Sequence, residues 1–299
     1  MDTLQAKLRC NSMHSVANPV KFHYDDADVE IYNTGKWLYM NLTGETDLEE
    51  LFFSILSLIF IYHGSFPTIH KVEINGVSED VSQYNSLFFT SSHFQNDCFK
   101  LCDINKNTIN EHIIAEYLKL PVYAIRSLQA LVCTAYEKVM SDHKITLMLH
   151  VIDGLISDEE GKSIEEDIKS QLMPSSYSKG KCSYAFKAYF LFNDNFFVYD
   201  NKSQILPVLR TDSIKFIRTI TDTRNHNTHF TAPKSNNLKI GVDNMIYLTL
   251  IYYTLRVYVI KKLGISLTDD MVTDGLGSIQ LWIFEIMQRN YSKSGNIET

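Results

Sequence analysis

One short stretch of the sequence combines residue types that can do chemistry on a phosphate. Between Arg224 and His229 the chain places one arginine, two asparagines, two histidines and a threonine in six consecutive positions. Arginine offers a permanent, forked cation to a phosphoryl oxygen, and histidine titrates near neutral pH. Such a pair suits the cleavage of RNA by its own 2′-hydroxyl, with histidine moving the proton and arginine stabilising the charge that develops at phosphorus.

Two other interpretations of the same stretch stay open at this point. Asp222, His226 and His229 stand at positions i, i+4 and i+7, and two histidines with a carboxylate are a legitimate metal-binding set. We find neither a fourth ligand nor a water-activating glutamate near them in the sequence. The third interpretation is structural: a polar helix end capped by histidine and arginine.

The spacing of the motif limits what one regular helix can do with it. At about 100° per residue, Arg224 and His229 point about 140° apart, whereas Asn225 and His229 share a face. Asparagine, threonine and histidine are also mediocre helix formers, and a place where a sequence breaks local rules is a candidate site. We therefore expect either a helix that ends near Thr228, so that His229 turns back, or a site that a second protomer completes.

The charge of the chain is distributed so that this segment favours an anionic partner. The sequence carries 28 Lys and Arg against 35 Asp and Glu, a net charge of −7, which by itself argues against nucleic acid. Residues 202–265, however, contain ten basic and three acidic side chains, a net charge of +7 that leaves −14 for the remainder. A solvated helix face would give the same count, but such asymmetry is typical of an anion-binding segment. The basic residues that we expect to bind RNA are Lys215, Arg218 and Lys234.

The elements that must position the motif are helices. Apolar periodicity and capping residues predict helices over residues 110–119, 122–140, 145–156, 164–172, 213–228, 242–263 and 269–288. The aromatic stretch 184–199 fits either a hairpin or a packed helix, and the sequence does not decide between them.

Before residue 108 the pattern is mixed. Strands are expected over residues 20–31, 37–42, 69–74, 86–90 and 97–104. A capping box opens one helix, over residues 47–62. We therefore predict an α+β protein, in which a small mixed α/β domain over residues 1–120 is followed by an all-α helical domain over residues 121–299.

Cysteine content and hydropathy indicate a reducing, aqueous environment. The five cysteines form no Cys-x-x-Cys pair, so neither a zinc knuckle nor a thioredoxin-like motif is expected. The apolar run 51–62 is too short to cross a bilayer, and the N-terminus lacks the apolar core of a signal peptide. We expect a soluble, cytoplasmic protein that uses no metal and no cofactor and makes no contact with a membrane.

The motif and its surroundings resemble a known family. The pattern Arg-Asn-x-x-x-His at residues 224–229 matches the Arg-x4–6-His signature of the HEPN superfamily (higher eukaryote and prokaryote nucleotide-binding). Its context, Asp-Thr-Arg-Asn at 222–225 and Thr-His-Phe at 228–230, is similar to the ApeA-type branch, as is the long helix expected over 245–262. The helical series resembles the HEPN domain, and the mixed segment before it looks like a shortened form of the N-terminal domain of ApeA-like proteins.

This resemblance implies an all-helical HEPN domain that forms a homodimer, with two Arg-x4-His motifs facing each other in one cleft. Active members of the family are metal-independent endoribonucleases that leave a 2′,3′-cyclic phosphate, often as toxins or antiphage abortive-infection effectors. Arg224 and His229 carry over as catalytic residues, and Asn225 is the polar residue that follows the arginine.

Four further residues are expected to support the site, and several partners of the protein are expected as well. Many HEPN domains add an acidic residue that orients the arginine; Asp153 is the candidate, and Asp222 competes for that role. His226 is a candidate to line the RNA cleft, and Thr228 to bind a phosphate or its own backbone. The implied partners are RNA, with tRNA suggested by the toxin relatives, and a phage-derived or nucleotide trigger. The alternative is a catalytically inactive adaptor that binds RNA or a nucleotide.

Overall fold

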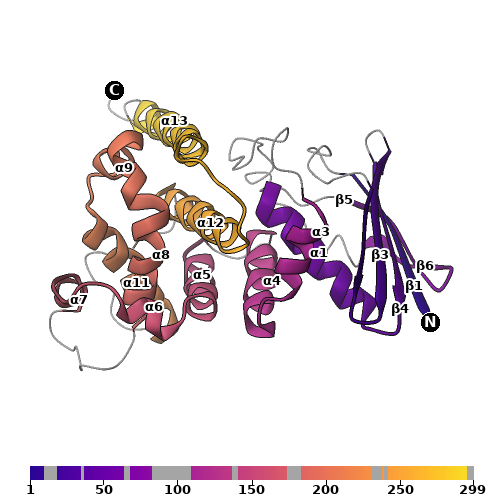
Figure 1. Cartoon of the computed structure of the whole chain (residues 1–299). Helices are drawn as coiled ribbons and strands as arrows, with labels where there is room; N and C mark the ends of the chain where they lie inside the picture. Colours follow the sequence, from indigo (N-terminus) through magenta and orange to yellow (C-terminus); the bar gives the residue numbers. More distant parts are fainter. Residues whose placement is uncertain are drawn as a thin grey trace. The chain divides into compact units, whose positions relative to one another are not determined.

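The structure, a computed structural model, describes residues 1–9, 19–34, 37–63, 68–82, 109–136, 141–173, 183–229, 238 and 242–294. The chain forms two compact units, Met1–Lys138 with Val259–Leu267, and Val139–Tyr258 with Thr268–Thr299. The first unit holds a sheet with helices, and the second is helical (Figure 1). The α+β class is confirmed. The domain boundary at residue 120 stays a prediction.

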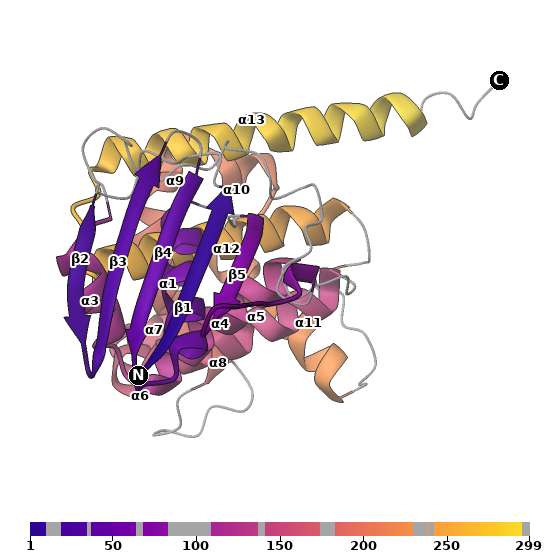
Figure 2. The same cartoon turned by 90° about the vertical axis from the view of Figure 1, so that its right-hand side faces the viewer.

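A six-stranded antiparallel sheet, with strand order β2-β3-β4-β1-β5-β6, organises the first unit (Figure 2). The strands are β1 Asp2–Arg9, β2 Val20–Tyr24, β3 Ala27–Thr34, β4 Trp37–Gly44, β5 Thr68–Ile74 and β6 Val77–Ser78. Alternate residues of β1, namely Leu4, Ala6 and Leu8, are buried, and the register sets them beside the buried residues of β4. Helix α1 (Leu48–His63) packs on β1 and β4 and covers this apolar face.

Two features of the sheet differ from the prediction. Residues 20–31 form two strands rather than one, because the chain turns at Asp25 and Asp26 between β2 and β3. Asp25 has a φ of +52°, a left-handed conformation that aspartate adopts more readily than most residues. Strand β1, which the sequence analysis did not assign, pairs with β4 on one side and β5 on the other. The strands expected over residues 86–90 and 97–104 lie outside the described residues.

Helices α3 (Glu111–Leu118) and α4 (Val122–Tyr136) complete the described part of this unit. Asn110 caps α3, because its side-chain oxygen accepts a hydrogen bond from the Ile113 amide at 3.0 Å. Helix α4 packs on α1, and the Arg126 guanidinium forms an ion pair with Glu50 at 2.9 Å. Both helices were predicted from the sequence.

The second unit is a bundle of helices. Those described are α5 Ser141–Leu155, α6 Asp158–Lys162, α7 Glu166–Leu172, α8 Tyr184–Phe192, the π-helical segment η3 Asn193–Phe197, α9 Val198–Ser203, α10 Ile205–Val208, α11 Ser213–His229, α12 Val242–Lys262 and α13 Asp269–Ser294. The last turn of α12 belongs to the first unit. None of the helices in the described ranges is long and apolar enough to cross a membrane.

An aromatic cluster shows why the stretch 184–199 is helical rather than a hairpin. Phe216 of α11 is fully buried, and its ring centroid lies 5.1 Å from that of Phe192 and 6.0 Å from those of Phe196 and Phe197. On α12, the ring of Tyr247 stacks on Phe216 at 4.7 Å. The π-helical turn brings Phe196 and Phe197, neighbours in sequence, to the same partner ring. This cluster holds α11 in place.

Candidate active site

The candidate catalytic residues lie on the C-terminal half of α11, which packs on α5 and α8. The helix continues through His229, the last residue described in it. The predicted end near Thr228 is thus within one residue of the last described helical residue, but the expectation that His229 turns back is wrong, because His229 is itself helical. Because the helix is regular, Arg224 and His229 point about 140° apart. The other expected arrangement, completion by a second protomer, stays a prediction.

Buried threonines allow the polar half of α11 to pack against other helices. The hydroxyls of Thr219, Thr221 and Thr223 each donate to the carbonyl four residues earlier, at 2.7 to 2.8 Å. The Thr223 hydroxyl also accepts a hydrogen bond from the Leu238 amide at 3.0 Å. Because these hydroxyls are satisfied, their burial does not carry the penalty of an unpaired polar group. These hydrogen bonds locally offset the poor helix propensity of this stretch.

Arg224 is the buried member of the motif, with 7% of its surface exposed. Its guanidinium carbon lies 4.0 Å from the ring centroid of Tyr184, the first residue of α8, which is a cation–π contact. One terminal nitrogen donates to the Asn225 side-chain oxygen at 3.0 Å. The Nε atom is buried and has no hydrogen-bond partner among the described residues. Leaving such a donor unsatisfied costs about 1–3 kcal/mol.

His229 belongs to the opposite, solvent-facing side of α11. That face carries Lys215, Arg218, Asn225 and His229, all exposed, at spacings of three, seven and four residues that align on one side of a helix. Asp222 and His226 are half-buried on the same helix. Beside Lys215 and Arg218, an open cavity of about 650 Å³ lies between α7 and the start of α11. We call Lys215, Arg218, Asn225 and His229 the exposed stripe.

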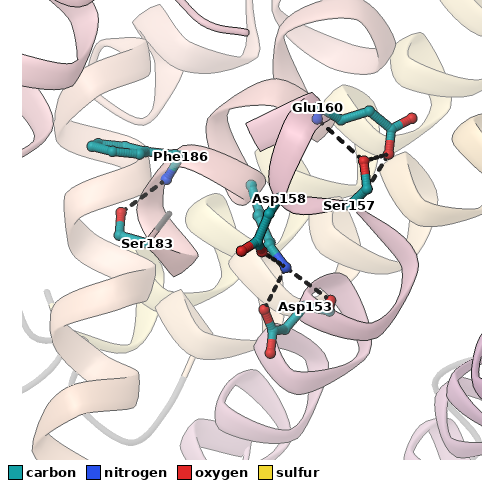
Figure 3. Close-up of polar contacts among 7 residues, drawn as sticks. Asp153, Ser157, Asp158, Glu160, Ser183 and Phe186 are labelled. Carbon is teal, nitrogen blue, oxygen red and sulfur yellow. Dashed lines mark hydrogen bonds and ion pairs between the residues drawn. The ribbon is translucent and has the colours of Figure 1, made fainter. Parts of the chain in front are cut away.

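Asp153 forms an ion pair with Lys187, whereas the sequence suggested that it orients Arg224. Its carboxylate lies 2.8 Å from the ammonium of Lys187 on α8, and Asp158 contacts the same ammonium at 2.8 Å (Figure 3). Lys187 is buried and also donates to the Asp153 carbonyl at 3.2 Å. The hydrogen bond from Lys187 lowers the pKa of Asp158. Among the described residues, the Arg224 guanidinium contacts the aromatic ring of Tyr184 and the side chain of Asn225.

Capping interactions fix the start of α6 and α8 around this ion pair. The Ser157 hydroxyl accepts from the Glu160 amide at 3.1 Å, and the Glu160 carboxylate accepts from the Ser157 amide at 2.9 Å, a capping box (Figure 3). The Ser183 hydroxyl accepts from the Phe186 amide at 3.3 Å and opens α8 (Figure 3). Tyr184 therefore starts a helix whose first turn is fixed by its cap.

The remaining predicted residues are spread around the end of α11. The Asn227 side-chain amide donates to the Thr146 hydroxyl of α5 at 3.4 Å, and Thr228 is exposed. In the described ranges no three His, Cys, Asp or Glu side chains gather so as to hold a metal ion. Asp222, His226 and His229 thus do not form the metal site considered above. Lys234 lies outside the described residues.

Two residues next to Arg224 were missed by sequence reasoning. The ring of Tyr184 contacts His150 of α5 in an edge arrangement, with centroids 6.0 Å apart. Burial and the charge of Arg224 lower the pKa of His150, while Asp153 acts in the opposite direction. Tyr184 stood in an aromatic stretch whose structure the sequence left open, and His150 was one of several scattered histidines. Neither carried a local signal.

The fold and the site together define a helical domain that bears an arginine–histidine motif on a long polar helix and follows a small antiparallel-sheet unit. Residues 154–269 match the model of the family described as Apea-like HEPN. The chain therefore carries an Apea-like HEPN domain, which includes Tyr184, Arg224 and His229. No curated protein and no solved structure matches the chain. The HEPN superfamily is associated with nuclease and RNA-related functions, and its domains generally act as dimers on RNA.

Proposed function

We propose that this protein is a metal-independent endoribonuclease that acts as an antiphage abortive-infection effector. The observation that carries the proposal is the guanidinium of Arg224, held by Tyr184 and with a buried Nε that has no partner among the described residues, on the same helix as the exposed imidazole of His229. An arginine placed in this way suits the stabilisation of charge on a phosphoryl group. The Apea-like HEPN match over residues 154–269 supports the same class of activity.

The separation of Arg224 and His229 around α11 favours a site made from two copies of the domain. A helix with its side chains is about 10–12 Å across, so one phosphate does not reach both residues of a single copy easily. In the reaction, the 2′-oxygen bonds to phosphorus as the bond to the 5′-oxygen breaks. A general base removes the 2′-proton, the 5′-oxygen gains a proton, and the product carries a 2′,3′-cyclic phosphate.

The test is RNA cleavage by the full chain. We expect the purified protein to cut single-stranded RNA equally well with and without EDTA, and to leave 2′,3′-cyclic phosphate ends. His229→Ala is expected to lose this activity, whereas His112→Ala, an exposed histidine of α3 in the first unit, is the matched control. Abolition by EDTA would overturn the mechanism. RNA binding without any cleavage by the wild-type protein would instead favour the adaptor function.

The exposed stripe gives a prediction about salt dependence. If Lys215 and Arg218 bind two phosphates of a single strand, replacing both by alanine should weaken binding and reduce the slope of log K against log salt by about 1.4, since each phosphate contact contributes about 0.7. The measurement is fluorescence anisotropy with labelled RNA at several salt concentrations, in the His229→Ala background so that the RNA stays intact. Lys162→Ala, an exposed lysine of α6, is the control. An unchanged slope would remove these two residues from the RNA path.

A further inference from the structure

The Tyr184 ring links Arg224 to a second histidine of the chain. The guanidinium carbon of Arg224 lies 4.0 Å from the ring centroid, and the imidazole centroid of His150 lies 6.0 Å from the same point. These two distances limit the separation of guanidinium carbon and imidazole to at most 10.0 Å. His150 is thus an imidazole held close to the Arg224 cation within one chain. His229, by contrast, points about 140° away around α11.

The contacts of Arg224 with the described residues use only part of its guanidinium. Tyr184 occupies one face of the guanidinium and Asn225 accepts from one terminal nitrogen, while Nε is buried and has no acceptor among the described residues. His150 is exposed at the surface of α5. An oxyanion that reaches Arg224 therefore comes within range of an imidazole that solvent and substrate can reach.

We propose that His150 is a further catalytic residue of this site, the general base for the phosphate that Arg224 binds, and that Tyr184 is a positioning residue for the guanidinium. The proposal rests on the proposed ribonuclease function. It adds a residue of helix α5 that lies before the matched segment 154–269.

The neutral imidazole of His150 removes the proton of the 2′-hydroxyl, and the 2′-oxygen forms its bond to phosphorus. The bond from phosphorus to the 5′-oxygen breaks, and the departing oxygen takes a proton from His229 of the other copy of the domain, which regains one from solvent. The imidazolium then returns its proton to solvent. Arg224 stabilises the additional negative charge on the phosphoryl oxygens during the transfer.

The electrostatic surroundings suit this role. The groups that act on His150 are the Arg224 cation from α11 and the Asp153 carboxylate from its own helix, with the Tyr184 ring packed from α8. Burial and Arg224 lower the pKa of His150 below its usual value of 6.5. Asp153 is itself held by the Lys187 ammonium. The imidazole is therefore neutral, and able to accept a proton, at neutral pH.

His150→Gln is the decisive variant, and His143→Gln is its matched control. His143 is an exposed histidine on the same helix, two turns earlier and within about 20° of the same direction. We expect His150→Gln to lower kcat/KM for RNA cleavage by about 10²–10⁴-fold, and His143→Gln to leave it unchanged. In the wild type, kcat/KM should fall as the pH drops through the lowered pKa of His150, because protonation of the imidazole removes the base. That acidic limb should be absent in His150→Gln.

Tyr184 is tested by a pair of variants. Tyr184→Phe keeps the ring under the guanidinium and should retain wild-type kcat, whereas Tyr184→Leu should lower kcat more than it raises KM. If the wild type cuts RNA and His150→Gln has the same rate and pH profile, the inference about His150 is overturned. The proposed function then still stands. A wild type that cuts no RNA would remove both.

Discussion

Replacing Arg224 by alanine is expected to lower kcat/KM for RNA cleavage by about 10²–10³-fold, the usual effect of removing one preorganised donor from an oxyanion site. The guanidinium is already oriented by the Tyr184 ring and by the Asn225 side chain. Little reorganisation is therefore needed when a phosphate arrives, and this is the condition under which such a donor contributes most. The measurement is single-turnover cleavage of a short labelled RNA.

Two further variants make the Arg224 prediction specific. Arg224→Lys keeps the charge but loses the planar fork, and with it the stack on Tyr184, so we expect it to remain strongly impaired. Arg218→Ala, on the exposed stripe of the same helix, should weaken RNA binding while leaving the rate at saturating RNA unchanged. Equal rates for wild type and Arg224→Ala at saturating RNA would show that the arginine does not act on the transition state.

The second large effect is on stability, and it concerns Phe216. Its side chain is fully buried among Phe192, Phe196 and Phe197 and stacks on Tyr247. Truncation to alanine leaves a cavity as well as lost burial, and we expect the free energy of unfolding to fall by about 3–5 kcal/mol. The measurement is urea unfolding of the full chain followed by the helical signal in circular dichroism.

The matched control for Phe216 is Phe284→Ala in α13. Phe284 is 42% exposed, so its truncation should change stability far less. Because Phe216 holds α11, the helix that carries Arg224, the Phe216→Ala protein should also lose RNA cleavage at temperatures where its helical unit begins to unfold. A loss of stability equal to that of Phe284→Ala would show that the aromatic cluster does not fix this helix.

The sequence predicted the elements and the motif better than the contacts. Most helices were found because apolar periodicity and caps are local signals. Helix α11 drew attention because its last five residues are poor helix formers. The stretch 184–199 was ambiguous because eight of its 16 residues are aromatic and they follow neither the period of a strand nor that of a helix. Residues 20–31 were predicted as one strand because apolar residues alternate on both sides of the turn at Asp25 and Asp26.

The partners of the charged residues could not be read from the sequence. Asp153 had several basic residues within reach of an unfolded chain, and only the packing of α5 on α8 selects Lys187. In the same way Tyr184 reaches Arg224 across 40 positions of sequence through the packing of α8 on α11. Local rules do not contain such information, because contacts between helices depend on which faces meet.

The π-helical turn at Asn193–Phe197 limits where a residue can be deleted from this domain. A turn closed by bonds from i to i+5 holds one residue more than an α-helical turn, and removing that residue would rotate everything after it by about 100°. Asp200, which caps α10 by accepting from the amides of Ile205 and Leu206 at 2.7 and 3.0 Å, would then face elsewhere. In this turn the number of residues, more than their chemistry, is under constraint. Substitutions should be tolerated at its exposed Asp194, whereas single-residue deletions anywhere within it should not.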